Sequence, residues 1–357
     1  MISKIGFKNF KCYDDISIKL SPLNVFTGLN GMGKSTVIQG LLCLRQSYME
    51  NKTMAGLYLN GKYTELGNGK DVLCEKAEGE PFIGVSLSEN KKEYEYVYAY
   101  DAISKVLKSS DISSEKEVSE AISTDQFVYL SANRIVPRIR YDLGNVEDVD
   151  ERDFGKTGEF AIQYMDKHGA DQYAGSDRSD LNVELDYWLQ EITPGVSPVI
   201  NVDQDKMYSD LRFEFREGNM KTSPYRAINV GFGLTYVLPV IVSLLTARPG
   251  DYIIIENPEA HIHPRGQRRL GELIARAISY GAQIIVETHS DHLMNGIRLS
   301  VKREEISKEK VNFVYFYKDE TTYDHNCIYP KIDENGKIDH WPKGFFDEWD
   351  ECLMELI

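Results

Sequence analysis

The sequence predicts an α/β fold in which helices cover a parallel sheet and a phosphate-binding loop follows one strand. Three observations predict it. A β-like run, LNVFTG, leads into the glycine-rich segment GLNGMGKST, and a helical run follows. Two later apolar runs, one in GDYIIIENPEAHIHP and one in GAQIIVETHSDHLMN, show almost no polar alternation, which is typical of strands buried on both faces. The ends of these runs carry Glu256, Thr288 and His289, at the sheet edge where α/β proteins bind ligands.

The other elements are predicted in order along the chain. FIGVSLS and YEYVYAY are β-like, and FVYLSANRIVPRIR predicts a buried strand that leads to three arginines at 134, 138 and 140. These arginines could meet phosphates or nucleic acid, or simply lie on the surface. TGEFAIQYMDKHG and LNVELDYWLQEI are helical. A strongly apolar helix then opens after the glycine turn in INVGFGLT, and a turn at Pro249 and Gly250 separates it from the strand that ends in Glu256.

The glycine-rich segment fits G-x-x-x-x-G-K-[ST], with Gly28, Gly33, Lys34 and Ser35 at the fixed places. Glycines allow backbone N–H groups to surround phosphates, and the helix that follows points its positive end at them. The lysine is expected to reach the β- and γ-phosphates, and the serine hydroxyl to join a Mg²⁺ ion. Strand, loop, lysine and helix stand in order, so we predict that the chain binds ATP with Mg²⁺.

Composition sets the class of protein. The 357 residues are 42% hydrophobic and 27% charged, as in a globular protein with a core. No apolar stretch approaches the roughly 20 residues that span a bilayer, and the first residues lack a secretion signal, so a cytoplasmic protein without a membrane partner is expected. The net charge of −15 argues against a surface that coats nucleic acid, although a local basic groove would remain compatible with it. The five scattered cysteines form no CxxC pair.

The interval between Lys34 and Glu256 is longer than a compact phosphate-loop domain needs, which predicts an inserted lobe. We therefore divide the chain into four segments. They are the first part of an ATPase head with the phosphate loop (1–130), an inserted and mainly helical lobe (131–226), the second part of the head (227–317) and a small C-terminal segment (318–357).

The order of these motifs resembles the ABC-type ATPase heads of the RecF, SMC and OLD group. It is most similar to the small stand-alone prokaryotic ATPases of phage-defence gene clusters. The opening IGFKNFKCYDD resembles the first strand of those heads, and the tail HWPKGFFDEWDECLMELI resembles the short C-terminal domain of one subgroup. The resemblance implies an ABC-type phosphate-loop head of the α/β class, with an inserted helical lobe and a small C-terminal segment.

The resemblance also assigns residues. Lys11 takes the place of a basic residue near the nucleotide, and NVGFGLT takes the place where the signature helix begins, which would touch the γ-phosphate held by a second subunit. Glu256 takes the Mg²⁺-supporting position, and His289 takes the switch-histidine position. The nucleotide-binding residues implied in this way are Lys11, Gly28, Asn30, Gly31, Gly33, Lys34, Ser35, Thr36, Asn229, Gly231 and Gly233. The glutamine that usually completes the Mg²⁺ site has no assigned position.

Two positions depart from the family pattern. Asn229 replaces the signature serine, and Asn257 replaces the usual catalytic glutamate after Glu256. An amide cannot accept a proton usefully, but it can orient a water molecule. We expect slow hydrolysis in which Glu259 and His289 assist, and the alternative is a nucleotide-clamped switch with negligible turnover. Zinc is disfavoured, because the paired histidines lack a third ligand at the usual spacing.

The predicted function is that of an ATP-binding, slowly hydrolysing ATPase that acts as a homodimer or higher oligomer. It would be a switch or regulatory subunit of prokaryotic anti-phage defence and would control a separate effector such as a nuclease or toxin. The alternative is a DNA-repair or chromosome-maintenance ATPase of the RecF and SMC type. A nuclease within this chain is disfavoured, because residues 318–357 are too few for an appended nuclease domain and contain no D-x-D cluster.

Overall fold

The computed structural model describes residues 1–79, 81–110, 117–172, 180–218, 220–346 and 348–356. The chain forms two units, each with its own core. The first unit comprises Met1–Asp125, Asn312–Lys331 and His340–Ile357, and the second comprises Gln126–Val311 and Ile332–Asp339. Helices and strands alternate in both, as predicted for an α/β protein. The boundaries of the four predicted segments stay a prediction.

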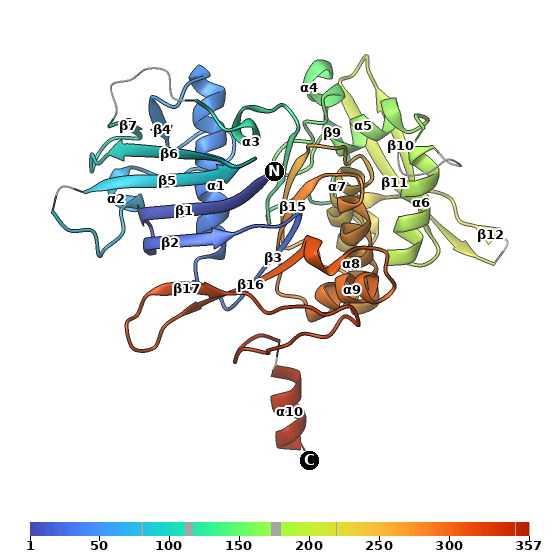
Figure 1. The fold of residues 1–357 in the computed structure, drawn as a ribbon. Helices are drawn as coiled ribbons and strands as arrows, with labels where there is room; N and C mark the ends of the chain where they lie inside the picture. Colours follow the sequence, from blue (N-terminus) through green and yellow to red (C-terminus); the bar gives the residue numbers. More distant parts are fainter. Residues whose placement is uncertain (80, 111–116, 173–179, 219, 347, 357) are drawn as a thin grey trace. The chain divides into compact units, whose positions relative to one another are not determined.

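The first unit consists mainly of strands around one long helix (Figure 1). Its elements are β1 (Ile2–Phe10), β2 (Tyr13–Lys19), β3 (Leu23–Thr27), α1 (Lys34–Asn51), β4 (Gly56–Tyr58), α2 (Gly69–Val72), β5 (Phe82–Glu89), β6 (Lys92–Ala99), β7 (Val106–Lys108), α3 (Glu120–Ser123), β16 (Val311–Lys318), β17 (His325–Ile328) and α10 (Glu348–Leu356). The strand predictions at 23–27, 82–88 and 94–99 and the helix prediction after the loop are confirmed.

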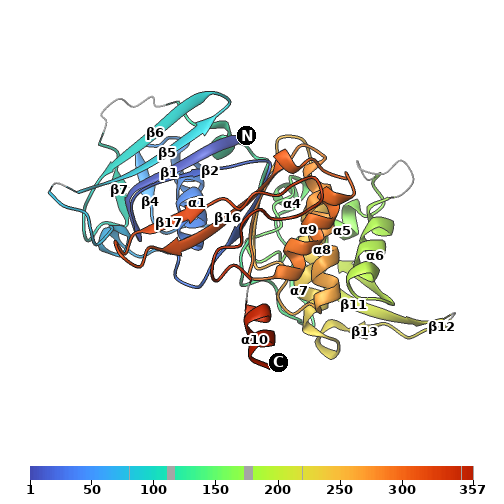
Figure 2. The same cartoon turned by 60° about the horizontal axis from the view of Figure 1, so that its bottom comes forward.

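In the antiparallel sheet β2-β1-β5-β6, the two central strands β1 and β5 are mostly buried, whereas the outer strand β2 largely alternates between buried and exposed residues. The helix α1 packs against this sheet, and a Cβ at Gly40 would lie 2.1 Å from the ring of Phe7. The same unit contains the neighbouring strands β17, β16 and β3, and β17 also runs close to β2 (Figure 2). The side-chain hydroxyl of Tyr329 accepts from the backbone N–H of Lys19 at 3.0 Å. This bond ties β2 to the end of the C-terminal hairpin, which is formed by β16 and β17. Residues 319–331 thus belong to the first unit.

The second unit combines helices with two sheets. Its elements are β8 (Phe127–Leu130), β9 (Tyr141–Asp142), α4 (Val146–Asp150), α5 (Ala161–His168), α6 (Leu181–Ile192), β10 (Val196–Asp203), β11 (Tyr208–Glu217), β12 (Met220–Lys221), β13 (Tyr225–Arg226), η1 (Ala227–Asn229), α7 (Phe232–Leu245), β14 (Tyr252–Glu256), α8 (Pro264–Ile278), β15 (Gln283–Glu287), α9 (Asp291–Lys302) and η2 (Lys308–Lys310). The helices predicted at 161–168, 181–192 and 232–245 are all present.

The parallel strands β15, β14 and β8 are neighbours in that order, as the unbroken apolar runs predict. Residue pairs Ile255↔Val286 and Ile255↔Leu130 are in register, so the carboxyl ends of all three strands meet at one edge. The residues of β15 are all buried, and those of β14 are buried up to Glu256. This edge holds the polar residues that the sequence analysis singled out.

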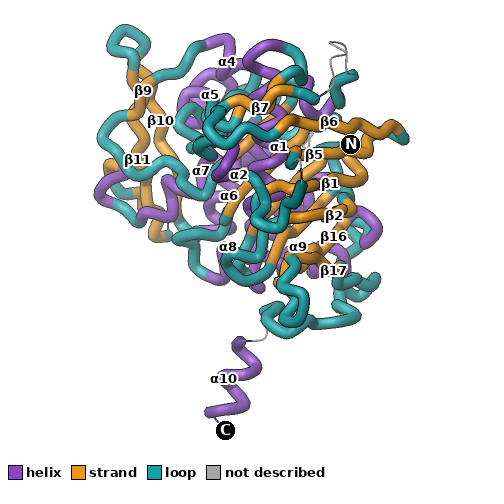
Figure 3. The backbone as a smooth tube through the Cα atoms, turned by 90° about the vertical axis from the view of Figure 1, so that its left-hand side faces the viewer, coloured by secondary structure: helices purple, strands orange, loops and turns teal. Residues whose placement is uncertain are grey.

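The segment at 131–226 contains a long antiparallel hairpin in addition to its predicted helices. Strands β10 and β11 pair from Val196↔Phe215 to Asp203↔Tyr208, and β9 joins the pair beside Tyr208 (Figure 3). One face packs on α5 and α6, where Leu211 and Phe213 are fully buried. The polar residues that alternate along β11 hide this hairpin in the sequence. Within the described ranges, no helix is both long and apolar enough to cross a lipid bilayer.

Candidate functional site

The glycine-rich loop of the first unit adopts backbone conformations that other residues rarely adopt. Gly28 has φ +132° and Gly33 has φ +100°. A Cβ at Gly28 would lie 2.3 Å from the carbonyl oxygen of Phe316, and a Cβ at Gly33 would lie 2.3 Å from the hydroxyl of Tyr13. Both the left-handed conformation and the tight packing therefore require glycine at these positions.

The loop ends at the N-terminus of α1, which begins at Lys34 without a side-chain cap. The first N–H groups of a helix lack partners within the helix and, with the helix dipole, favour an anion. The side chain of Lys34 is buried, and its ammonium donates to the carbonyl oxygens of Gly28 at 2.7 Å and Leu29 at 2.8 Å. The ammonium thus lies over the loop, at the place where phosphates would bind. This arrangement fits the phosphates of a nucleoside triphosphate.

The other predicted residues of the first unit surround this loop. Lys11 donates from Nζ to Oε1 of Gln39 on α1 at 2.6 Å, and burial lowers the pKa of the Lys11 ammonium. The buried Thr36 hydroxyl accepts from the Cys12 thiol at 3.6 Å. Asn30 and Gly31 are exposed at the loop tip, and Ser35 lies in the first turn of α1. The structure therefore gathers Lys11 and the whole loop in one place.

In the second unit, Glu256 is the last residue of β14, and two hydrogen bonds hold its carboxylate in place. Its Oε1 accepts from the Tyr129 hydroxyl at 3.1 Å, and its Oε2 accepts from the backbone N–H of Ala132 at 3.1 Å. Burial raises the pKa of Glu256, and these hydrogen bonds and the charge of Arg134 oppose the rise. Tyr129 lies in β8, the strand parallel to β14, and Ala132 follows that strand. The carboxylate is a suitable acceptor for a metal-bound water molecule.

Arg134 is the most buried charged side chain near this edge, with only 2% of its surface exposed. Its guanidinium donates to the backbone carbonyls of Ser131, Glu256 and Asn257. The same group stacks on the ring of Tyr236 in α7, with 4.1 Å between the guanidinium carbon and the ring centroid. Arg134 therefore holds the turn after Glu256, whereas the other two arginines of the trio, at 138 and 140, are exposed. The alternative that all three arginines lie on the surface is therefore wrong for Arg134, because its side chain is buried.

The turn that contains Asn257 and Glu259 is tied to the end of β15. Asn257 has φ +43°, and its N–H donates to the carbonyl of Glu287 at 2.7 Å. Glu259 is 8% exposed, and its Oε1 accepts from the backbone N–H of His289 at 2.8 Å. Burial raises the pKa of Glu259, and the hydrogen bonds from His289 and Thr288 oppose the rise. The His289 side chain is exposed beside this carboxylate.

The predicted signature residues lie around the start of α7. Asn229 ends η1 and is exposed, and Gly231 is the N-cap of α7. A Cβ at Gly233 would lie 2.2 Å from the carbonyl of His261, so this glycine lets α7 approach the turn after β14. The Tyr236 hydroxyl donates to the carbonyl of Ala132, whose N–H binds Glu256. The start of α7 is thus linked to Glu256 through residue 132.

The structure places the predicted residues in two groups. The first unit holds Lys11, Gly28, Asn30, Gly31, Gly33, Lys34, Ser35 and Thr36, and the second holds Asn229, Gly231, Gly233, Glu256, Asn257, Glu259 and His289. The sequence analysis missed Tyr129 and Tyr236 and left the role of Arg134 open. A cluster of three or more His, Cys, Asp or Glu residues suited to a metal ion is absent from the part of the chain that the structure describes. The Ser35 hydroxyl and the Glu256 carboxylate each carry oxygen of the kind that Mg²⁺ prefers as a ligand.

Comparisons with known proteins agree with this geometry. A Smc head bound to the C-winged helix domain of ScpA is 13% identical, with 92% of this chain and 98% of that chain covered and a TM-score of 0.57. A Smc head with an extended coiled coil, bound to the C-terminal domain of ScpA derived from Pyrococcus furiosus, is 11% identical, with 99% of each chain covered and a TM-score of 0.52. These likenesses confirm the predicted head fold. Curated proteins give no match.

Two family models match the sequence. Residues 306–356 match a model described as "Protein of unknown function (DUF3696)". Residues 23–295 match a model described as "AAA domain, putative AbiEii toxin, Type IV TA system", which includes the phosphate loop, α7, β14 and β15. Because this second match covers most of the 357 residues, the chain belongs to that family of AAA ATPase domains, with the fold of an ABC-type ATPase head.

Proposed function

We propose that the chain is an ATP-driven switch that hydrolyses ATP slowly and controls a separate effector in prokaryotic anti-phage defence. The observation that carries the ATP part is the loop geometry, in which left-handed glycines, a buried lysine and an uncapped helix start converge. The defence part is supported by the family description, which names a type IV toxin–antitoxin system. The roles of the individual site residues are inferred from the order of the motifs and from the geometry within each unit.

The proposed chemistry is the transfer of the γ-phosphoryl group to water. The loop and Lys34 would hold the phosphates, and by the motif order Ser35 and Glu256 would hold Mg²⁺, which would supply neutralisation of the phosphate charge. A water molecule attacks the γ-phosphorus, the bond to the β–γ bridging oxygen breaks, and ADP and phosphate leave. The proton of the water passes to a carboxylate, and Glu259 is the group assigned here because burial raises its pKa.

Asn257 and His289 would orient the water and the γ-phosphate. The backbone N–H of His289 donates to the Glu259 carboxylate at 2.8 Å, and the imidazole of the same residue is exposed. A side-chain amide at 257 positions water without accepting its proton, which supports slow turnover. A bound ATP molecule would then persist long enough to serve as a signal.

The switch requires two copies of the chain. The start of α7 presents exposed side chains, with Ile228 at 44% and Phe232 at 39% exposure beside the exposed Asn229. We assign this surface to the ATP held by a second copy, so that ATP binding favours a closed pair and hydrolysis releases it. A two-state pair of this kind can control an effector, such as a nuclease or toxin, that is encoded separately. We assign the pair and its effector to the cytoplasm.

A second candidate is a DNA-repair or chromosome-maintenance ATPase. The observation that favours it is the likeness in fold to Smc heads, two of which were solved with a ScpA domain bound. The sequence identities of 13% and 11% carry the fold and no further property. The net charge of −15 favours a protein effector over an extended nucleic-acid surface.

Phosphate release and light scattering with and without ATP test the proposal. We expect slow release of phosphate and a doubling of mass with ATP. Lys34→Ala should abolish both, because it removes the charge opposite the β- and γ-phosphates, and the exposed Lys4→Ala should match wild type. A monomer in saturating ATP would refute the switch. Capture of the neighbouring gene product distinguishes the candidates, since a nuclease or toxin supports defence and a repair protein supports the alternative.

A further inference from the structure

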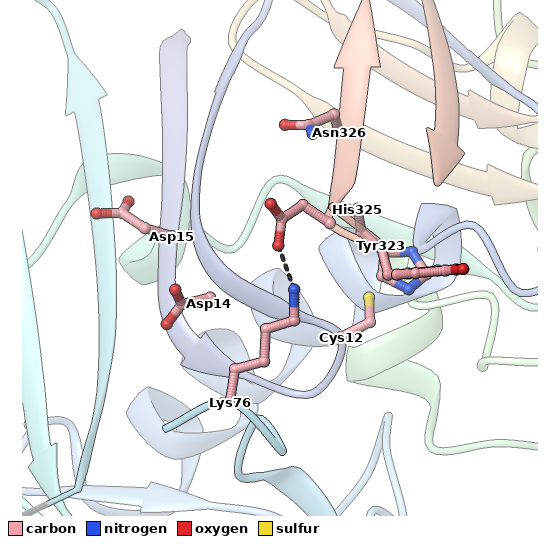
Figure 4. Close-up of a pocket in the computed structure, with 8 residues that line it drawn as sticks. Cys12, Asp14, Asp15, Lys76, Tyr323, His325 and Asn326 are labelled. Carbon is pink, nitrogen blue, oxygen red and sulfur yellow. Dashed lines mark hydrogen bonds and ion pairs between the residues drawn. The ribbon is translucent and has the colours of Figure 1, made fainter. Parts of the chain in front are cut away.

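Two pockets differ in their relation to the phosphate loop. A pocket of about 150 Å³ in the first unit is lined by Cys12 and His325, among others (Figure 4). The Cys12 thiol donates to the Thr36 hydroxyl at 3.6 Å, so this pocket belongs to the phosphate-loop site already described. A larger pocket of about 440 Å³ lies in the second unit, between the β10–β11 hairpin and the helices α5 and α6. None of the residues that line the larger pocket has a role in the proposed hydrolysis.

One face of the hairpin forms part of the wall of this larger pocket. Ser197 of β10 lies directly opposite Glu214 of β11, and both line the pocket. Ser197 is only 6% exposed, and its hydroxyl has no hydrogen-bond partner among the described residues. A buried polar group without a partner needs an explanation, and a ligand in the pocket would supply one.

The backbone of β10 leaves one edge of the hairpin unpaired. The N–H of Arg216 donates to the carbonyl of Gly195 at 2.7 Å, one position beyond the pair Val196↔Phe215, so these two residues form a hydrogen-bonded pair of the antiparallel ladder. Bonded and non-bonded pairs alternate along such a ladder. The N–H and C=O groups at positions 198, 200 and 202 therefore point away from β11. We call these three residues the outer edge of β10, and no described strand pairs with it.

The outer edge of β10 is a template for a further strand. Proline at 198 lacks an N–H and so suits an edge position, whereas Ile200 and Val202 each keep a donor and an acceptor. All three residues are half-buried, and Pro198 and Ile200 also line the pocket. An extended peptide can pair its backbone with such an edge and place alternate side chains in a neighbouring pocket.

The charges around the pocket favour a basic side chain. Asp186 pairs with Arg216 at 3.7 Å. Glu214 pairs with Lys221 at 3.1 Å. The exposed carboxylate of Asp166 forms no ion pair or hydrogen bond with any described residue, and partial burial raises its pKa. The pocket therefore carries one uncompensated negative charge, and the net charge of −15 attracts a basic partner over a longer range.

We propose that the outer edge of β10 binds an extended strand of the effector, and that a lysine or arginine of this strand pairs with Asp166. The backbone of Ile200 and Val202 supplies the hydrogen bonds that hold the strand, and the pocket selects its basic side chain. The inference rests on the proposed function only in naming the effector as the source of the strand.

The test uses a labelled heptapeptide in which threonine and valine alternate around a central lysine, and fluorescence anisotropy measures its binding to the full chain. We expect saturable binding that Asp166→Asn weakens about fivefold, because a partly exposed ion pair is lost. Asp205→Asn is the matched control, since it makes the same change in the β10–β11 turn outside the pocket, and it should bind as wild type does. Asp166→Lys should prefer a peptide with a central glutamate over the lysine peptide.

Two methylated forms of the lysine peptide test the strand pairing. Each form carries methyl groups on one of the two alternating sets of backbone nitrogens. Only one set of N–H groups faces the neighbouring strand in a paired strand. One form should therefore lose binding while the other keeps it, and equal binding of the two forms would overturn the proposal.

The outcomes separate this inference from the proposed function, because the peptide test uses no ATP. If the chain binds the lysine peptide as described but does not hydrolyse ATP, the proposed function fails and the strand site stands. No saturable binding of the lysine peptide, or an unchanged affinity in Asp166→Asn, would overturn the inference alone. A dimer without ATP that the lysine peptide dissociates would also overturn it, because a second copy would then occupy this edge. Circular dichroism spectra that match wild type show that the variants are folded.

Discussion

Replacing Arg134 tests the view that this buried arginine holds the turn after Glu256. Arg134→Met keeps most of the side-chain length and removes the guanidinium, which donates to the carbonyls of residues 131, 256 and 257. Three bonds from a charged donor at about 1.5 kcal/mol each total about 4.5 kcal/mol. Relief from burying a charge offsets roughly 1–2 kcal/mol. We expect a net loss of about 3 kcal/mol in the free energy of unfolding.

Urea denaturation followed by circular dichroism measures this loss. Burial lowers the pKa of Arg134 to about 10, so the guanidinium is charged throughout the neutral range of the assay. Arg138→Met is the matched control, because that side chain is exposed four residues further along the chain. Its free energy of unfolding should stay within about 0.5 kcal/mol of wild type. Equal losses for the two variants, or no loss for Arg134→Met, would refute the reasoning.

Two further predictions concern the loop and the turn. Gly33→Ala should destabilise the chain and weaken ATP binding more than Gly31→Ala. Both glycines have positive φ, but only at Gly33 would a Cβ meet a neighbour, the Tyr13 hydroxyl at 2.3 Å. Thermal unfolding and ATP titration compare the two variants, and equal effects would contradict the packing argument. Burial raises the pKa of Glu259 above its ordinary value of 4.5, so the folded state holds this proton more tightly, and the resulting stability is lost as the pH rises through the folded pKa. Glu259→Gln should therefore lose less stability than wild type as the pH rises from 4.5 in urea titrations, and an identical pH profile would count against the assignment.

The sequence predicts the elements whose signal is local. The phosphate loop, α1, β14 and β15 are all found at the predicted places, because glycine spacing and unbroken apolar runs depend on neighbouring residues. The roles within the site depend on contacts between distant residues. Arg134 is one of three arginines in a short stretch, and only the pairing of β8 with β14 shows that it is the buried one.

The hairpin β10–β11 and the pocket beside the loop escaped prediction for a related reason. Alternating polar residues along β11 mask a strand with one buried face. The pocket joins Asp14 to residues more than 300 positions away, from Tyr323 to Asn326, and no local pattern marks that meeting. Glu259 was singled out from its position after the strand, but its bond to the His289 backbone depends on the parallel register of β14 and β15.

The bonds of Lys34 bear on how the loop selects its ligand. The ammonium donates to the carbonyl oxygens of Gly28 and Leu29 at 2.7 and 2.8 Å. An incoming nucleotide therefore competes with the loop's own oxygens for the same three N–H donors. A triphosphate brings enough negative charge near the lysine to win this exchange, whereas a monophosphate held at the α-position would leave the lysine with its carbonyls. The loop would thus select its ligand by the length of the phosphate chain.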